Sequence, residues 1–182
     1  MSSIYGRNLL ETVIEKSSKK SWDSAVLEWE IDDVIEDKDN KSTCICGKEN
    51  IRYLFTIRNS YNQNTLFPIG SSCIKKFNRE DLNEITLINE KLFKLFHAIK
   101  TNKYIQLSSD YFSRKLLEYF FNQGVFKPSQ YNNFNGEKDY NFMLKMFNMR
   151  SQPTASQSKK INAIIMTSIK PYLVHMLNDK TL

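Results

Sequence analysis

Three cysteines are the residues of this 182-residue chain whose types and spacing can do chemistry. Cys44 and Cys46 enclose a single residue, and Cys73 follows Cys46 after 26 intervening residues. Alternate side chains of an extended backbone point the same way, so Cys44 and Cys46 can face one ion. Thiolates gathered around one centre are typical ligands of zinc. The spacing therefore predicts a cysteine knuckle that binds zinc.

Two observations keep a second interpretation open. Paired cysteines of structural zinc sites usually enclose about two to four residues, and here they enclose one. No fourth ligand is evident, because His97 and His175 lie far along the chain. Asp39 or a residue of another chain are the candidates to complete the site. The alternative is a set of three reduced, partly buried thiols without a metal, and an odd count of three argues against a disulfide scaffold.

The elements around the cysteines must bring them together. Gly47 can adopt the positive φ that a sharp turn behind a metal requires. Alternating apolar residues predict strands over 25–31 and 51–58, and residues 65–69 can return as the second strand of a hairpin. The core-facing residues are Ala25, Leu27, Trp29 and Ile31 in the first strand, and Ile51, Tyr53, Phe55 and Ile57 in the second. Cys73 then falls in the first turn of a helix, where free N–H groups favour a thiolate.

The remaining segments indicate helices. Apolar spacing predicts an N-terminal helix over 4–18, a long helix over 82–99 and helices around 140–147 and 161–169. Ser109 is expected to cap a further helix that ends at Gly124, and Pro171 either kinks the last helix or begins another. The aromatic runs Phe120–Phe121 and Tyr131–Phe134 are expected in the core. The prediction is an α+β fold: a small antiparallel sheet with a cysteine knuckle (1–103), then a helical unit of about four helices (104–182).

Composition bounds the class of protein. With 41% hydrophobic residues the chain can bury a core, which excludes general disorder. No apolar run approaches the length of a membrane span, and the N-terminus lacks the pattern of a signal peptide, so a soluble cytoplasmic protein is expected. The 26 basic residues against 20 acidic ones give a net charge of +6. This charge permits contact with nucleic acid or an acidic protein surface but does not require it.

Basic residues cluster around the predicted hairpin and are the candidates for binding RNA or a partner: Lys48, Arg52, Arg58, Lys75, Lys76 and Arg79. Tyr53, Tyr61 and Phe67 lie near them, and cations interleaved with aromatic rings can hold phosphates and stack bases. An alternative for two of the arginines is structural, because Glu28 and Glu30 can pair with Arg52 and Arg58 across strands. Lys75, Lys76 and Arg79 are therefore the better contact candidates.

The acidic residues between Glu28 and Asp39 admit three interpretations. They can hold Mg²⁺ for phosphodiester chemistry, mimic a nucleic-acid backbone, or form a solvated strand face and loop. His97 and His175 fit helix packing better than general-base catalysis. The chain has no P-loop, nucleophile elbow or zinc-protease motif, so no catalytic residue is assigned and a non-enzymatic role is favoured.

Segments of the chain resemble a recurrent zinc-ribbon-like, or treble-clef-like, domain of phage and mobile-element proteins in Gram-positive bacteria. The resemblance lies in Trp29-Glu30, in CICGKENIRYLFTIRN (Cys44 to Asn59) and in PIGSSCIKKF (Pro68 to Phe77). Asp139 to Phe142 and Thr154 to Gln157 resemble the helical segments that accompany such modules. The chain departs from that pattern in lacking a fourth ligand.

The length, the lysine- and asparagine-rich composition and this layout are similar to broad-spectrum type II-A anti-CRISPR proteins of streptococcal mobile elements. The resemblance implies an inhibitor that binds the type II CRISPR effector nuclease and its guide RNA, with loss or truncation of the guide. Any RNA cleavage would then be carried out by the partner nuclease. A phage nucleic-acid-binding zinc-ribbon protein and a metal-dependent nuclease remain the alternatives.

Overall fold

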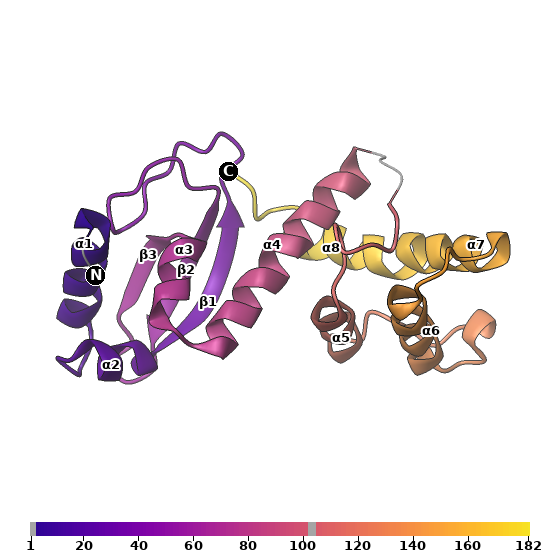
Figure 1. Cartoon of the computed structure of the whole chain (residues 1–182), viewed down its shortest axis with the longest axis horizontal. Coiled ribbons are helices and arrows are strands. Elements are labelled where there is room, and N and C mark those ends of the chain that lie inside the picture. The colour runs from indigo at the N-terminus through magenta and orange to yellow at the C-terminus, as the bar shows by residue number, and fades with distance from the viewer. Residues whose placement is uncertain (1–2, 102–104) are drawn as a thin grey trace. The chain divides into compact units, whose positions relative to one another are not determined.

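The computed structural model describes residues 3–101 and 105–182, and they form two compact units (Figure 1). Residues 3–87 together with Lys180–Leu182 make the unit that contains the cysteines, here called the cysteine unit. Ile88–Asp179 make the helical unit. The α+β class with an antiparallel sheet and a cysteine knuckle is confirmed. The boundary that the sequence suggests near Lys103 lies outside the described residues, whereas the division of the structure falls between Leu87 and Ile88.

The cysteine unit is built on a three-stranded antiparallel sheet in the order β1-β2-β3. Its elements in chain order are α1 (Ile4–Lys16), α2 (Trp22–Ala25), the 3₁₀ turn η1 (Val26–Glu28), β1 (Trp29–Glu36), β2 (Tyr53–Asn59), β3 (Thr65–Ile69), α3 (Ser71–Ile74), the 3₁₀ turn η2 (Lys75–Phe77) and the start of α4 (Glu80–Lys100). The short helix α3 packs against β2 (Figure 1). The helix α1 begins at the N-cap Ser3, whose hydroxyl accepts a hydrogen bond from the Gly6 N–H.

The strand β1 begins later than the sequence predicts. Residues 22–28 form two short helical turns rather than the first half of a strand. Leu27 is consequently 65% exposed instead of facing the core, while Val26 and Trp29 are buried. The prediction was wrong because the alternation of residues 25–31 is typical of a strand, whereas the buried Val26 and Trp29 lie three apart, the spacing that a 3₁₀ turn places on one side.

The predicted hairpin of β2 and β3 is confirmed, and β2 is the central strand. Leu54, Phe55 and Ile57 on β2 are each at most 1% exposed, which shows that both faces of the strand are covered. Burying each of these side chains stabilises the fold by about 1.5–3 kcal/mol. Ile51 lies just before the strand, where it forms an isolated bridge with Ser42. The core of this unit therefore surrounds the strand that leads from one part of the cysteine knuckle to the other.

The helical unit contains the rest of α4 and the helices α5 (Arg114–Asn122), α6 (Gly136–Asn148), α7 (Ala155–Ile164) and α8 (Lys170–Leu177), with a 3₁₀ turn η3 (Gln130–Asn132) and a π-helical segment (Ile165–Ile169). Helix α5 is capped by Ser113 and not by Ser109, and Gly124 has the expected positive φ of 66°. Pro171 lies in the first turn of α8. No helix in the described part of the chain is long and apolar enough to cross a membrane.

The prediction that both aromatic runs lie in the core holds for Phe120 but not for the other rings. Phe120 is fully buried, whereas Phe121 is 38% exposed and stacks on Tyr140 with ring centroids 4.6 Å apart. Tyr131 and Phe134, in contrast, are 83% and 75% exposed on the loop before α6. The reason is local: the loop turns the buried amide of Asn132 inward, where it donates to the Lys127 carbonyl oxygen and the Asp139 carboxylate, and this leaves the flanking aromatic side chains outside.

Candidate metal centre

The three cysteines meet in the interior of the cysteine unit. The Sγ atoms of Cys73 and Cys44 lie 3.6 Å apart, and those of Cys73 and Cys46 lie 3.4 Å apart. All three ligand atoms lie within 4.8 Å of one another, and each cysteine is at most 3% exposed. Tetrahedral thiolates at a zinc–sulfur distance of about 2.3 Å lie about 3.8 Å apart. The donor set and its spacing therefore fit a metal ion that prefers sulfur ligands.

A tight turn produces the first half of the centre. The Gly47 N–H donates to the Cys44 carbonyl oxygen over 2.7 Å, and the Cys44 N–H donates to the Lys48 carbonyl oxygen over 2.9 Å. Gly47 has a φ of +90°, a conformation that side chains with a Cβ rarely adopt, as the sequence predicts for this position. The turn places Cys44 and Cys46 on the same side of the chain. Glycine is required here by the backbone angle, since a Cβ would meet only ordinary contacts.

The end of β3 produces the second half. The Ile45 N–H donates to the Pro68 carbonyl oxygen over 2.9 Å, which joins the knuckle to β3. The Gly70 N–H then points at the Cys44 Sγ over 3.3 Å, and α3 begins directly after it with Cys73 in its single turn. Hairpin, knuckle and α3 thus converge on the thiols.

The pKa values of the thiols distinguish Cys44 from Cys73. Hydrogen bonding from the Cys73 thiol, aided by the N–H groups of Cys46 and Gly70, lowers the pKa of Cys44 despite its burial. The same pairing and burial raise the pKa of Cys73. Helical position alone favours Cys73 as the thiolate, but α3 has only four residues and the hydrogen bonds converge on Cys44 instead. Of these two thiols, Cys44 is therefore the one that its surroundings favour as a thiolate.

The described residues do not supply a fourth ligand from histidine, cysteine or carboxylate side chains within the group. Asp39, the candidate from the sequence, lies on the surface, where its carboxylate pairs with Lys41 over 2.7 Å. His97 and His175 belong to the helical unit. The arrangement can hold a metal through three thiolates and leaves one coordination position to a water molecule or another molecule.

One contact to the knuckle was missed at the level of the sequence. The Asn8 side chain donates its Nδ2 hydrogen to the Cys46 carbonyl oxygen over 3.1 Å, so α1 supports the knuckle from a segment 38 residues away. Glu28, which the sequence predicted to pair with an arginine across strands, is instead 2% exposed and accepts hydrogen bonds from Ser18 N–H, Lys19 N–H and Asn59 Nδ2. Nothing in the local sequence pattern of either residue signals these long-range contacts.

The three predicted arginines pair with carboxylates of the cysteine unit, and Arg52 and Arg58 remain about half exposed while they do so. Arg52 pairs with Glu36 over 2.7 Å, which raises the pKa of the arginine, and Arg58 pairs with Asp32 over 2.8 Å. The expected pairing of these two arginines with carboxylates of the first strand is thus confirmed, but the partners are Glu36 and Asp32 instead of Glu28 and Glu30. Glu30 lies opposite Arg58 in the register, but a bulge between Ile31 and Asp33 brings Asp32 to the guanidinium.

Arg79 has a purely internal set of partners among the described residues. Its guanidinium donates to the carbonyl oxygens of Val26 and Trp29 and to the Asp81 carboxylate. The pairing lowers the pKa of Asp81. Arg79 therefore ties the start of β1 to the start of α4.

The three predicted lysines are placed differently. Lys48 follows the knuckle turn, and Lys75 and Lys76 follow Cys73 in η2; all three are exposed. None of them forms an ion pair among the described residues. Phe67 on β3, next to the residue that bonds the knuckle, is 49% exposed. These four side chains are named the knuckle surface below: Lys48, Phe67, Lys75 and Lys76.

The acidic residues of the first strand do not gather into a cation site in the described part of the chain, because the only candidate cluster there is the three cysteines. Asp32 and Glu36 pair with arginines, and Asp33 pairs with Lys180. Asp37 accepts hydrogen bonds from the Asp39, Lys41 and Ser42 N–H groups and from the Ser42 hydroxyl, which lowers its pKa. These carboxylates shape the sheet edge and the following loop.

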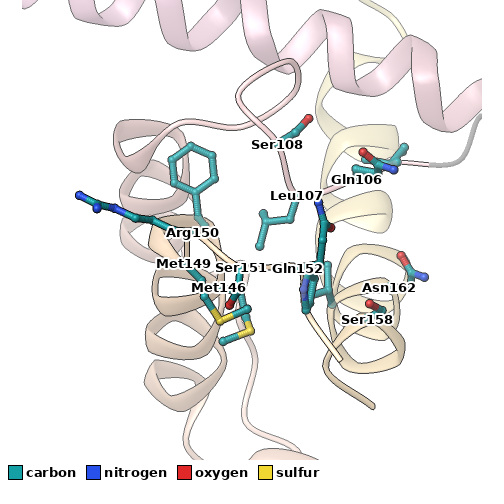
Figure 2. Close-up of a pocket in the computed structure, with 14 residues that line it drawn as sticks. Gln106, Leu107, Ser108, Met146, Met149, Arg150, Ser151, Gln152, Ser158 and Asn162 are labelled. Atoms are coloured by element: carbon teal, nitrogen blue, oxygen red, sulfur yellow. The ribbon is translucent and has the colours of Figure 1, made fainter. Parts of the chain in front are cut away.

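A pocket of about 250 Å³ lies within the helical unit (Figure 2). It is bounded by residues 105–108, by the C-terminal end of α6 and by α7. Figure 2 shows Leu107, Met146 and Gln152 between these segments, with the Arg150 guanidinium pointing away from them. The pocket brings together none of the cysteines or basic residues predicted from the sequence, so the cysteine centre remains the candidate site.

Comparison with known proteins adds no identity, since no family model, no curated protein and no solved structure matches the chain.

Proposed function

We propose that this protein is a zinc-containing inhibitor that binds the type II CRISPR effector nuclease with its guide RNA through the knuckle surface. The observation that carries the proposal is the distribution of the basic side chains. The arginines form ion pairs with carboxylates of the cysteine unit, whereas Lys48, Lys75 and Lys76 are exposed on the segments that hold the thiols. Exposed lysines beside an aromatic ring match the phosphates and bases of an RNA. The resemblance of residues 29–77 to mobile-element proteins supplies the type of partner.

Zinc is the metal we assign to the cysteine centre. Three thiolates with a spacing close to that of a tetrahedral sulfur set favour zinc over magnesium or calcium, which prefer oxygen ligands. The metal would be held by Cys44, Cys46 and Cys73 and would fix the knuckle to β3 and α3. Its role is structural, because it would hold the lysine-bearing segments in one arrangement.

Elemental analysis of protein purified without a histidine tag tests the metal. The expected result is about one equivalent of zinc per chain, reduced in a Cys73→Ser variant. Less than about a tenth of an equivalent in the parent protein contradicts the assignment.

The inhibition itself is tested by incubating the protein with effector nuclease and guide RNA, and by reading target cleavage and guide length together. We expect loss of target cleavage, and guide shortening only when the nuclease is present. A Lys48→Ala, Lys75→Ala, Lys76→Ala triple variant should lose inhibition, while Arg58→Ala, which removes an engaged cation, should retain it. Full target cleavage at a large molar excess of the protein refutes the proposal.

A second function is favoured by a separate observation. The helical unit has 13 lysines and arginines against 6 aspartates and glutamates. Such an excess favours a nucleic-acid-binding protein of phage replication or transcription that needs no nuclease partner. This function predicts salt-sensitive binding to free DNA or RNA, without an effect on target cleavage. A metal-dependent nuclease is not favoured, because the described acidic residues between Glu28 and Asp39 form no cluster that could hold a cation.

A further inference from the structure

The loop between α5 and α6 presents two aromatic side chains to solvent. Tyr131 is 83% exposed and Phe134 is 75% exposed, although a Phe side chain in water gains nothing for folding. Scattered single exposures are ordinary, but these two residues lie three apart on one turn. Packing in the hydrophobic core therefore does not account for the presence of these two aromatic side chains.

The loop is held rigidly from within. Asn132 is 2% exposed, and its amide donates to the Lys127 carbonyl oxygen over 2.9 Å and to the Asp139 carboxylate over 2.8 Å. The same amide accepts hydrogen bonds from the N–H groups of Ser129 and Asn135. Lys160 closes the arrangement on the Asp139 carboxylate over 3.4 Å. A loop fixed in this way loses little conformational entropy when a ligand binds to it.

Phe134 is held in a backbone conformation that its side chain disfavours. Its φ is +57°, and the preceding Asn133 has a φ of +55°. Asparagine tolerates this region, whereas a bulky aromatic residue there is uncommon and glycine would be at ease. The Phe134 N–H donates to the Ser129 carbonyl oxygen over 2.7 Å, which keeps the strained turn closed. Strain of this kind, combined with exposure, points to a ligand-binding role.

The chemistry around the rings selects the ligand. Residues 127–136 contain no aspartate or glutamate, and they include Lys127 together with the exposed amides of Gln130 and Asn133. Lys138 is exposed on the first turn of α6, beside Glu137, which is also exposed and is the acidic residue nearest to the loop in sequence. Exposed rings, amides and cations, with the nearby Asp139 carboxylate buried and paired with Lys160, fit unpaired bases and their phosphates, whereas a hydrophobic protein surface needs no amides.

We propose that this loop binds single-stranded nucleic acid, with bases stacking on Tyr131 and Phe134 and phosphates held by Lys127 and Lys138. The net charge of +7 between Ile88 and Asp179 draws the strand to the unit. The site lies in the helical unit and uses none of the cysteines or knuckle lysines. It goes beyond the proposed function and stands whether or not the protein inhibits a nuclease.

Fluorescence anisotropy with a labelled single-stranded oligouridine at low salt, on the full chain, tests the proposal. The Tyr131→Ala, Phe134→Ala double variant should bind about 5- to 100-fold more weakly, and the ring-retaining pair Tyr131→Phe, Phe134→Tyr should bind as the parent does. Met166→Ala is the matched control, since Met166 is 51% exposed in the same unit but lies on another segment.

Phe134→Gly separates binding from folding. Glycine relieves the positive φ, so the melting temperature of this variant should rise while its affinity for oligouridine falls. A lower melting temperature together with the lower affinity would assign the ring a structural role and overturn the proposal. The proposal is also overturned if the parent protein binds no single-stranded oligonucleotide, or binds duplex RNA as tightly as single strands. Two further results would overturn it: a double variant that binds as the parent does, or rings that are needed only for binding a protein partner. The knuckle lysine variants should keep oligouridine binding, so failure of this site and failure of nuclease inhibition give different results.

Discussion

The cysteine unit carries 13 basic and 14 acidic residues, whereas the helical unit carries 13 basic and 6 acidic ones. In the first unit, Arg52, Arg58 and Arg79 are engaged with carboxylates of the same unit. The second unit has too few carboxylates to neutralise its cations. The arginines of the cysteine unit thus pair within the fold, whereas Lys48, Lys75 and Lys76 of that unit and the excess cations of the helical unit are left available for ligands. The total of +6 conceals this division.

Removal of the metal should affect the stability of the two units most differently, because only the cysteine unit contains the thiols. A chelator or Cys73→Ser should unfold the cysteine unit and leave the helical unit folded, since structural zinc contributes on the order of 10 kcal/mol to small domains. Both tryptophans, Trp22 and Trp29, lie in the cysteine unit, so tryptophan fluorescence reports on that unit alone. Helical circular dichroism at α5 to α8 should largely persist. An unchanged tryptophan spectrum after chelation contradicts this expectation.

A substitution in the helical unit should give the opposite pattern. Gly136→Ala places a Cβ 1.8 Å from the Phe126 carbonyl oxygen, so the start of α6 must shift, at a cost of about 3 kcal/mol. Circular dichroism during urea unfolding should show the loss, while the tryptophan transition stays in place. Gly124→Ala is the control, since it has a φ of +66° but open space around it, and it should cost about 1 kcal/mol.

The buried carboxylate of Glu28 offers a test by pH. Burial alone would raise its pKa, but hydrogen bonds from Asn59, Ser18 and Lys19 outweigh burial and lower the pKa below 4.5. A lowered pKa means that the stabilisation is complete above about pH 4.5 and is lost as the pH falls through the folded-state pKa. Glu28→Gln should lower the free energy of unfolding by about 2 kcal/mol at neutral pH. It should also make this free energy depend less on pH on the acid side, and tryptophan fluorescence during unfolding measures both effects. A variant with the parent's pH dependence would show that Glu28 is not the responsible group.

The smallest expected effects sharpen the contrast between arginines and lysines. Arg58→Ala removes a half-exposed ion pair with Asp32 and should cost no more than about 0.5 kcal/mol of unfolding free energy. Lys75→Ala and Lys76→Ala should leave stability unchanged. Each should instead reduce the salt dependence of binding to the guide-loaded nuclease by about one unit of slope. Equal salt slopes for the lysine variants and Arg58→Ala would remove the distinction between the two sets.

Sequence patterns predicted the elements that rest on local chemistry. The hairpin, the helix over 80–100, the turn at Gly47 and the convergence of the cysteines follow from alternation, helical spacing and the needs of glycine. The start of β1 could not be predicted in this way, because the alternation of residues 25–31 indicates a strand, whereas Val26 and Trp29 point inward with the three-residue spacing of a 3₁₀ turn.

The site could be predicted only in part, since charge pairing depends on register. Because of the bulge in β1, Arg58 pairs with Asp32 instead of Glu30, and no local sequence pattern predicts a bulge there. The exposure of Tyr131 and Phe134 likewise depends on the buried amide of Asn132, whose partners are set by the folded loop. Composition suggests core for these rings, and only the hydrogen-bonded backbone places them outside.

The last three residues return to the cysteine unit, where Thr181 forms a parallel bridge with Glu36 at the end of β1 and the Lys180 carbonyl oxygen accepts the Glu36 N–H over 2.9 Å. During synthesis, the 92 residues from Ile88 to Asp179 leave the ribosome before this contact can form. The outer edge of β1 at Glu36 therefore stays unpaired until the whole helical unit has been translated. The cysteine unit therefore becomes complete only after the helical unit has been translated, and a ribosome stalled before Lys180 would hold a nascent chain in which this end of β1 lacks its partner.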